Sequence, residues 1–67
     1  MTKDKFVEVL KKTGISANIE NGMVTIPLVD ADKAEVSSMF TRVKLIANKV
    51  GYKHSFRVTK LKEERDD

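Results

Sequence analysis

One long amphipathic stretch, from Asp30 to Gly51, constrains the fold of this chain more than any other feature. Its apolar residues recur at alternating spacings of three and four, which is the period of one face of an α-helix. These residues are Val36, Met39, Val43, Ile46 and Val50, with Phe40 and Ala47 beside them. Asp30 or Asp32 can cap the first turn, and Asp32 with Glu35 has the spacing of a capping box. Gly51 stands where helices commonly end, so we expect one long helix here.

A shorter helix is expected before it, between Thr2 as the N-terminal cap and Gly14 as the stop. Its apolar face holds Phe6, Val9 and Leu10, while its lysines face solvent. A helix of about three turns is marginal in water, so packing against the rest of the chain must stabilise it.

The dipeptide Asn21-Gly22 lies between two runs in which apolar and polar residues alternate. Both residues tolerate the positive φ of a type I′ turn, so the pattern predicts a β-hairpin with a two-residue loop. The predicted pairs are Glu20 with Met23, Ile19 with Val24, Ala17 with Ile26, and Ile15 with Leu28. Pro27 has no N–H group, so the pairing with the first strand should fail near it.

A third strand is expected from Tyr52 to Leu61, again from alternation. His54, Phe56 and Val58 should point one way, and Lys53, Ser55, Arg57 and Thr59 the other. The order α-β-β-α-β predicts a two-layer α+β domain with both helices on one face of a three-stranded sheet. Strand order 2-1-3 makes the sheet antiparallel, whereas order 1-2-3 makes it mixed. We favour 2-1-3, because parallel strands usually need both faces covered and one face here is polar.

Size and composition indicate the domain organisation and the cellular location that we expect. We expect residues 1–62 to form a single domain and residues 63–67, which are acidic, to be disordered. A domain this small is marginally stable or gains stability by self-association. The chain has no cysteine, no apparent signal peptide and no apolar run of membrane-spanning length, so we expect a cytoplasmic protein that is not membrane-bound.

No catalytic or cofactor-binding pattern stands out. One histidine and no cysteine exclude the usual metal clusters, and each glycine is explained by a helix end or a turn. The carboxylates of Asp30, Asp32 and Glu35 are explained by helix capping. We therefore expect a protein that is not an enzyme and that needs no metal or cofactor.

Charge is distributed unevenly along the chain. Residues 1–35 hold five lysines and six acidic residues, whereas residues 36–62 hold seven basic residues and no acidic one. Cations on a rigid surface can contact nucleic-acid phosphates, so our first hypothesis is a small nucleic-acid-binding accessory protein. The basic surface would comprise Arg42, Lys44, Lys49, Lys53, Arg57 and Lys60. No aromatic residue is expected on the open sheet face, so binding would be mainly electrostatic.

Three apolar residues are expected on the surface instead of in the core: Leu45 on the long helix, and Met23 and Leu61 on the sheet. If they lie together, they form a patch for a protein partner or for a second copy of the chain. The second hypothesis is accordingly a protein-interaction module, a small adaptor or inhibitor with an acidic partner or a homodimer. An unprotected edge strand would offer another route to association.

Overall fold

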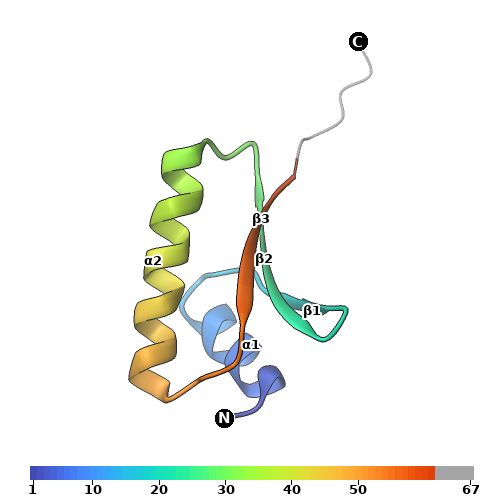
Figure 1. Ribbon diagram of the computed structural model, residues 1–67, viewed down its shortest axis with the longest axis vertical. Coiled ribbons are helices and arrows are strands. Elements are labelled where there is room, and N and C mark those ends of the chain that lie inside the picture. The colour runs from blue at the N-terminus through green and yellow to red at the C-terminus, as the bar shows by residue number, and fades with distance from the viewer. Residues whose placement is uncertain (62–67) are drawn as a thin grey trace.

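The computed structural model describes residues 1–61, which form two helices and three strands in the predicted order (Figure 1). The elements are α1 (Lys3–Lys12), β1 (Asn18–Glu20), β2 (Met23–Val29), α2 (Lys33–Val50) and β3 (Phe56–Leu61). The chain is thus an α+β domain. The acidic tail and the predicted domain boundary at residue 62 lie outside the described residues.

Both helices begin at the residues that the sequence predicts. The Thr2 side chain accepts a hydrogen bond from the Lys5 N–H at 3.2 Å, and the Asp32 carboxylate accepts one from the Glu35 N–H at 2.8 Å. Each bond satisfies an N–H group that has no partner within the first helical turn. Gly51 ends α2 with φ of 75°, in the left-handed region where only glycine is free of strain.

The hairpin forms at Asn21 and Gly22, both with positive φ. Its register is the predicted one where the strands pair, with Ile19 opposite Val24 and a third pair added at Asn18. β1 contains no residue before Asn18, so the predicted pairs of Ala17 with Ile26 and Ile15 with Leu28 are wrong. The two residues Ile15 and Ala17 are nevertheless buried. As expected, the β1 ladder ends before it reaches Pro27.

The preferred strand order is wrong. The sheet has the order β1-β2-β3, with β1 antiparallel and β3 parallel to β2, so it is mixed and not antiparallel. Only β2 is long enough to pair with β3 over six residues, because β1 has three. The ladder continues beyond β2, where the Asp30 N–H donates to the Leu61 carbonyl at 3.0 Å. The longer pairing of β3 with β2 therefore outweighs the cost of leaving one face of this parallel pair uncovered.

The third strand is shorter than the alternation predicts, because it begins at Phe56 and not at Tyr52. Tyr52 is buried before the strand starts, with its hydroxyl donating to the Ser55 carbonyl at 3.3 Å. His54 was expected to point inward but is exposed, and its ring contacts the edge of Tyr52 with 5.4 Å between centroids. Two residues that the alternation assigns to the strand thus have other roles: the Tyr52 N–H donates to the Ala47 carbonyl at the end of α2, and His54 contacts the Tyr52 ring.

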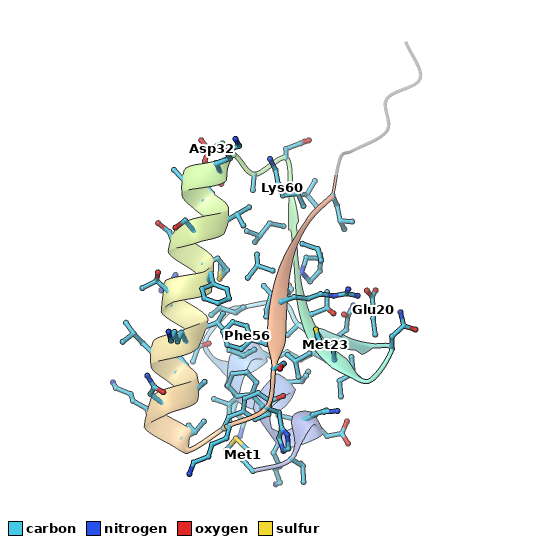
Figure 2. All side chains as sticks on the ribbon, in the orientation of Figure 1. Met1, Glu20, Met23, Asp32, Phe56 and Lys60 are labelled. Atoms are coloured by element: carbon cyan, nitrogen blue, oxygen red, sulfur yellow. The ribbon has the colours of Figure 1, made fainter. Side chains whose placement is uncertain are left out.

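Both helices pack on the same face of the sheet. The core joins side chains of α1, α2 and the sheet in one cluster. Phe56 of β3 lies between the helices, with its ring centroid 6.4 Å from that of Phe6 in α1 and 5.0 Å from that of Phe40 in α2 (Figure 2). Within residues 1–61 no helix covers the opposite face of the sheet, which we call the open face.

Candidate functional site

Arg57 lies on the open face but is already engaged by its neighbours. Its Nε–H donates to the Thr25 hydroxyl at 3.2 Å, and a terminal guanidinium nitrogen lies 3.6 Å from a Glu20 carboxylate oxygen. Glu20 projects from the hairpin that β1 and β2 form (Figure 2). The neighbouring carboxylate offsets the guanidinium charge, so the open face presents little net positive potential at this point.

Neither Lys53 nor Lys60 lies on the open face beside Arg57, so the predicted basic surface is divided. Lys60 has the same alternation as Phe56 and Val58, so it lies on the helix-covered face, and its cross-strand partner is Leu28. It is at the end of the molecule where Asp32 caps the start of α2 (Figure 2). Lys53 is exposed in the segment before β3.

The three apolar surface residues also fail to form one patch. Met23 and Leu61 are on the open face but at opposite ends of the β2–β3 pair, where Leu61 is the cross-strand partner of Val29. Leu45 belongs to the helical layer on the other side of the sheet. The open face is therefore mostly neutral, and Leu45 requires a separate explanation.

The structure brings together one of those apolar residues and two of the predicted cations. Arg42, Leu45 and Lys49 line a hollow of about 540 Å³ along α2, with 60 % of Leu45 exposed. The other lining residues are Thr13, Ile46 and Asn48. The residues of α2 meet there because spacings of three and four place them on one flank of the helix. We call this hollow the basic groove.

A second hollow, of about 350 Å³, lies near the start of α2 and has the opposite charge. Asp32 and Glu35 supply its carboxylates, and Leu28 and Met39 supply much of its apolar lining. Ala34 and Ser38 complete it. We call it the acidic hollow. Helix capping accounts for Asp32 and Glu35 in the sequence and so conceals this hollow, although Glu35, Ser38 and Arg42 follow the same helical spacing as Leu45 and Lys49.

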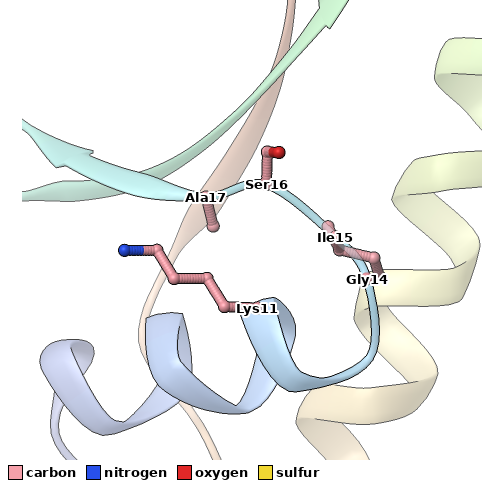
Figure 3. A pocket seen from close by; sticks show the side chains of 5 residues that line it. All are labelled: Lys11, Gly14, Ile15, Ser16 and Ala17. Carbon is pink, nitrogen blue, oxygen red and sulfur yellow. The ribbon is translucent and has the colours of Figure 1, made fainter.

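A third hollow, of about 400 Å³, lies where the chain leaves α1 for β1. It is lined by Lys11, Gly14, Ile15, Ser16 and Ala17. Figure 3 shows the Ala17 side chain directed toward Lys11 and the Ser16 hydroxyl directed away from it. A single exposed lysine over this backbone gives no pair of groups with which to hold a ligand.

The remaining predicted cation, Lys44, lies on α2 but on the flank away from the basic groove, because it is two residues from Arg42 along the helix.

The described residues offer few other groups that could bind a metal or transfer a proton. In residues 1–61, no three His, Asp or Glu side chains are grouped so that they could hold a metal ion. Burial raises the pKa of the Tyr52 hydroxyl above its ordinary value.

Comparison with known proteins found no match to a family model, to a characterised protein or to a solved structure. In the part of the chain that the structure describes, neither helix has the length and apolar character required to cross a membrane. The candidate site is therefore assigned from the geometry of the structure, chiefly that of α2.

Proposed function

We propose that this protein is a non-enzymatic protein-interaction module that docks an acidic, partly apolar partner segment in the basic groove. One observation carries the proposal: Leu45 is 60 % exposed and lies in a hollow that Arg42 and Lys49 also line. A cytoplasmic location is consistent with the absence of cysteine and belongs to the same proposal.

The groove has the composition of a small docking surface. Leu45 and Ile46 provide apolar area whose removal from water favours binding, and they lie between longer charged side chains. Arg42 and Lys49 can receive carboxylates of the partner, which speeds encounter and orients the bound segment. Among residues 1–61 the single ion pair joins Arg57 to Glu20, so neither groove cation is neutralised by a carboxylate of that range.

The proposal can be tested by selecting short peptides from a displayed random library on the immobilised protein. We expect enrichment of peptides that combine Asp or Glu with a large apolar residue. In ¹⁵N-labelled protein, these peptides should shift amide resonances of Arg42, Leu45 and Lys49. Peptides that are enriched without such a pattern, or that shift resonances of the open face instead, would contradict the proposal.

Two matched variants sharpen the test. Leu45→Ser should abolish peptide binding, because the apolar centre of the groove is lost. Val29→Ser is the control, since Val29 is also 60 % exposed but lies on the open face. Equal loss of binding in both variants would show that the groove is not the docking surface.

Nucleic-acid binding is a second candidate, favoured by the sign of the charge on residues 36–61. This range contains six basic side chains and no acidic one. They are Arg42, Lys44, Lys49, Lys53, Arg57 and Lys60. The engagement of Arg57 by Glu20 and the position of Lys60 on the helix-covered face divide this set between surfaces, so we place the candidate second.

A mobility-shift assay with duplex DNA and single-stranded RNA over a salt series separates the two functions. Nucleic-acid binding should weaken steeply with salt, because each neutralised phosphate releases counterions. It should be lost when Lys44 and Lys53 are both replaced by Glu and should persist in Leu45→Ser. Absence of any shift at low salt would eliminate this second candidate.

A further inference from the structure

We propose that the partner of the basic groove is a second copy of this chain, docked antiparallel along α2. The inference rests on the proposed function, because it uses the same groove and names its occupant. It adds the acidic hollow as the complementary half of the interface.

One exposed flank of α2 carries an acidic side chain near the N-terminal end of the helix and basic side chains toward its C-terminal end. Its residues follow spacings of three and four: Glu35, Ser38, Arg42, Leu45 and Lys49. Glu35 and Arg42 are seven residues apart, which places them on the same side of the helix with about 10 Å between their levels along the axis. The acidic half begins at the helix N-terminus and the basic half ends at its C-terminus, so each charge also has the sign that the helix dipole favours.

A two-fold axis across this flank makes the surface complementary to itself. With the axis level with Ser38 and Met39, Glu35 of each copy faces Arg42 of the other, so the same ion pair forms twice. The same operation brings Leu45 level with the acidic hollow of the second copy. There Leu28 and Met39 can bury it. Ala34 and Ser38 are small, and they allow the two helices to approach closely.

α1 leaves this flank of α2 open. Phe6 of α1 stacks on Tyr52, just beyond the C-terminal end of α2 (Figure 1), and Thr13, the C-cap residue of α1, lines the basic groove. Leu28, at the other end of the sheet, is left half-buried. A second α2 would cover this region, and a domain of this size gains stability from such association.

The interface is expected to be small. An 18-residue helix is about 27 Å long. Two such helices bury less than the roughly 1,200 Å² of a standard stable interface. We therefore expect a weak dimer that is populated at high protein concentration and low salt, because its paired charges are screened by ions.

Charge exchange tests the arrangement directly. Light scattering and sedimentation over a concentration series should show a monomer–dimer equilibrium for the unaltered chain. Glu35→Arg alone places two cations opposite each other, and Arg42→Glu alone places two anions opposite each other, so each variant should be monomeric. An equimolar mixture of the two variants should form a heterodimer, because both facing pairs again have opposite signs. The variant that carries both substitutions should recover the homodimer.

Recovery in the mixture cannot arise from misfolding of the single variants, and circular dichroism of each variant provides an independent check of folding. The inference is overturned if the unaltered chain is monomeric at every concentration, or if the mixture remains monomeric. Dimers that persist in both single variants would also overturn it. Failure here leaves the peptide-selection result intact, so a module that binds only foreign partners is distinguished from one that has no functional groove.

Discussion

Phe6 and Tyr52 stack face to face, with ring centroids 4.0 Å apart and ring planes 4° from parallel. Phe6 lies near the start of α1, and Tyr52 directly follows Gly51, the residue that ends α2. Phe6 is fully buried and Tyr52 is 4 % exposed. This contact connects the first helix to the end of the second helix, and it closes the core at the end of the molecule where β3 begins.

Replacing Phe6 by alanine should therefore destabilise the domain severely. Removing a buried phenylalanine costs about 3–5 kcal/mol, through lost burial and the cavity that remains. This is a large part of the stability of a domain of this size. Urea denaturation followed by circular dichroism should show little folded protein for Phe6→Ala and a reduced midpoint for Phe6→Leu. Phe40→Ala is the control, because Phe40 is 44 % exposed and should cost clearly less. Equal losses for Phe6 and Phe40 would contradict the assigned core.

The burial of Tyr52 predicts a dependence of stability on alkaline pH. Burial raises the pKa of its hydroxyl, so the folded protein retains this proton when the unfolded chain begins to lose it near pH 10. The contribution to the free energy of unfolding is complete below about pH 10 and decreases as the pH rises through the folded pKa. Tyr52→Phe should lack this component, so the difference between the two unfolding free energies should change above about pH 10.

The same group can be observed directly. The chain has one tyrosine and no tryptophan, so the absorbance of tyrosinate reports on Tyr52 alone. Its titration should occur at higher pH in the folded protein than in urea. Coincident titration curves under the two conditions would show that the hydroxyl is not buried.

The local elements were predictable from the sequence because their signals are short-range. Capping by Thr2 and Asp32, the turn at Asn21-Gly22 and the helix stop at Gly51 each depend on a few neighbouring residues. Side-chain oxygens at caps and residues that tolerate positive φ at turns determine these features almost independently of the rest of the chain.

Strand order was not predictable because it depends on how much of each strand actually pairs. The alternation extends the first strand back to Ile15, but the chain there packs into the core and does not continue the ladder. With β1 reduced to three residues, β2 is the better neighbour for β3. The sequence pattern indicates which side chains are buried, but it does not distinguish burial in a sheet from burial in a connecting segment.

The candidate site was predicted only in part for a related reason. The sequence places Arg42, Lys49 and Leu45 on the surface, but its charge pattern and its apolar pattern predict two separate surfaces. Helical spacing places all three on one groove. Arg57, by contrast, faces the open side as expected, and its engagement by Glu20 depends on a cross-strand distance that composition cannot supply.

The Arg57–Glu20 pair should contribute little to stability. Both side chains are about half exposed, at 45 % and 56 %, and a terminal guanidinium nitrogen of Arg57 lies 3.6 Å from a carboxylate oxygen of Glu20. Solvent screening limits such pairs to roughly 0.2–1 kcal/mol. A double-mutant cycle with Arg57→Gln and Glu20→Gln, measured by urea denaturation, should give a coupling energy in this range that decreases with added salt. A coupling several times larger that is insensitive to salt would contradict the exposed geometry.

Substitution of Gly51 tests the energetic cost of backbone conformation alone, because a Cβ at this position contacts no other atom. Its φ of 75° is unfavourable for any residue with a Cβ, yet a Cβ built there meets no atom within 4 Å. Gly51→Ala should therefore cost about 1–2 kcal/mol from the left-handed conformation alone. Gly51→Asn should cost less, because the asparagine side chain can form local hydrogen bonds in that conformation. The urea midpoint should be highest for the unaltered chain, lower for Gly51→Asn and lowest for Gly51→Ala. If alanine were tolerated as well as glycine, α2 would have to end in another conformation, and the position of Tyr52 against Phe6 would then need a different explanation.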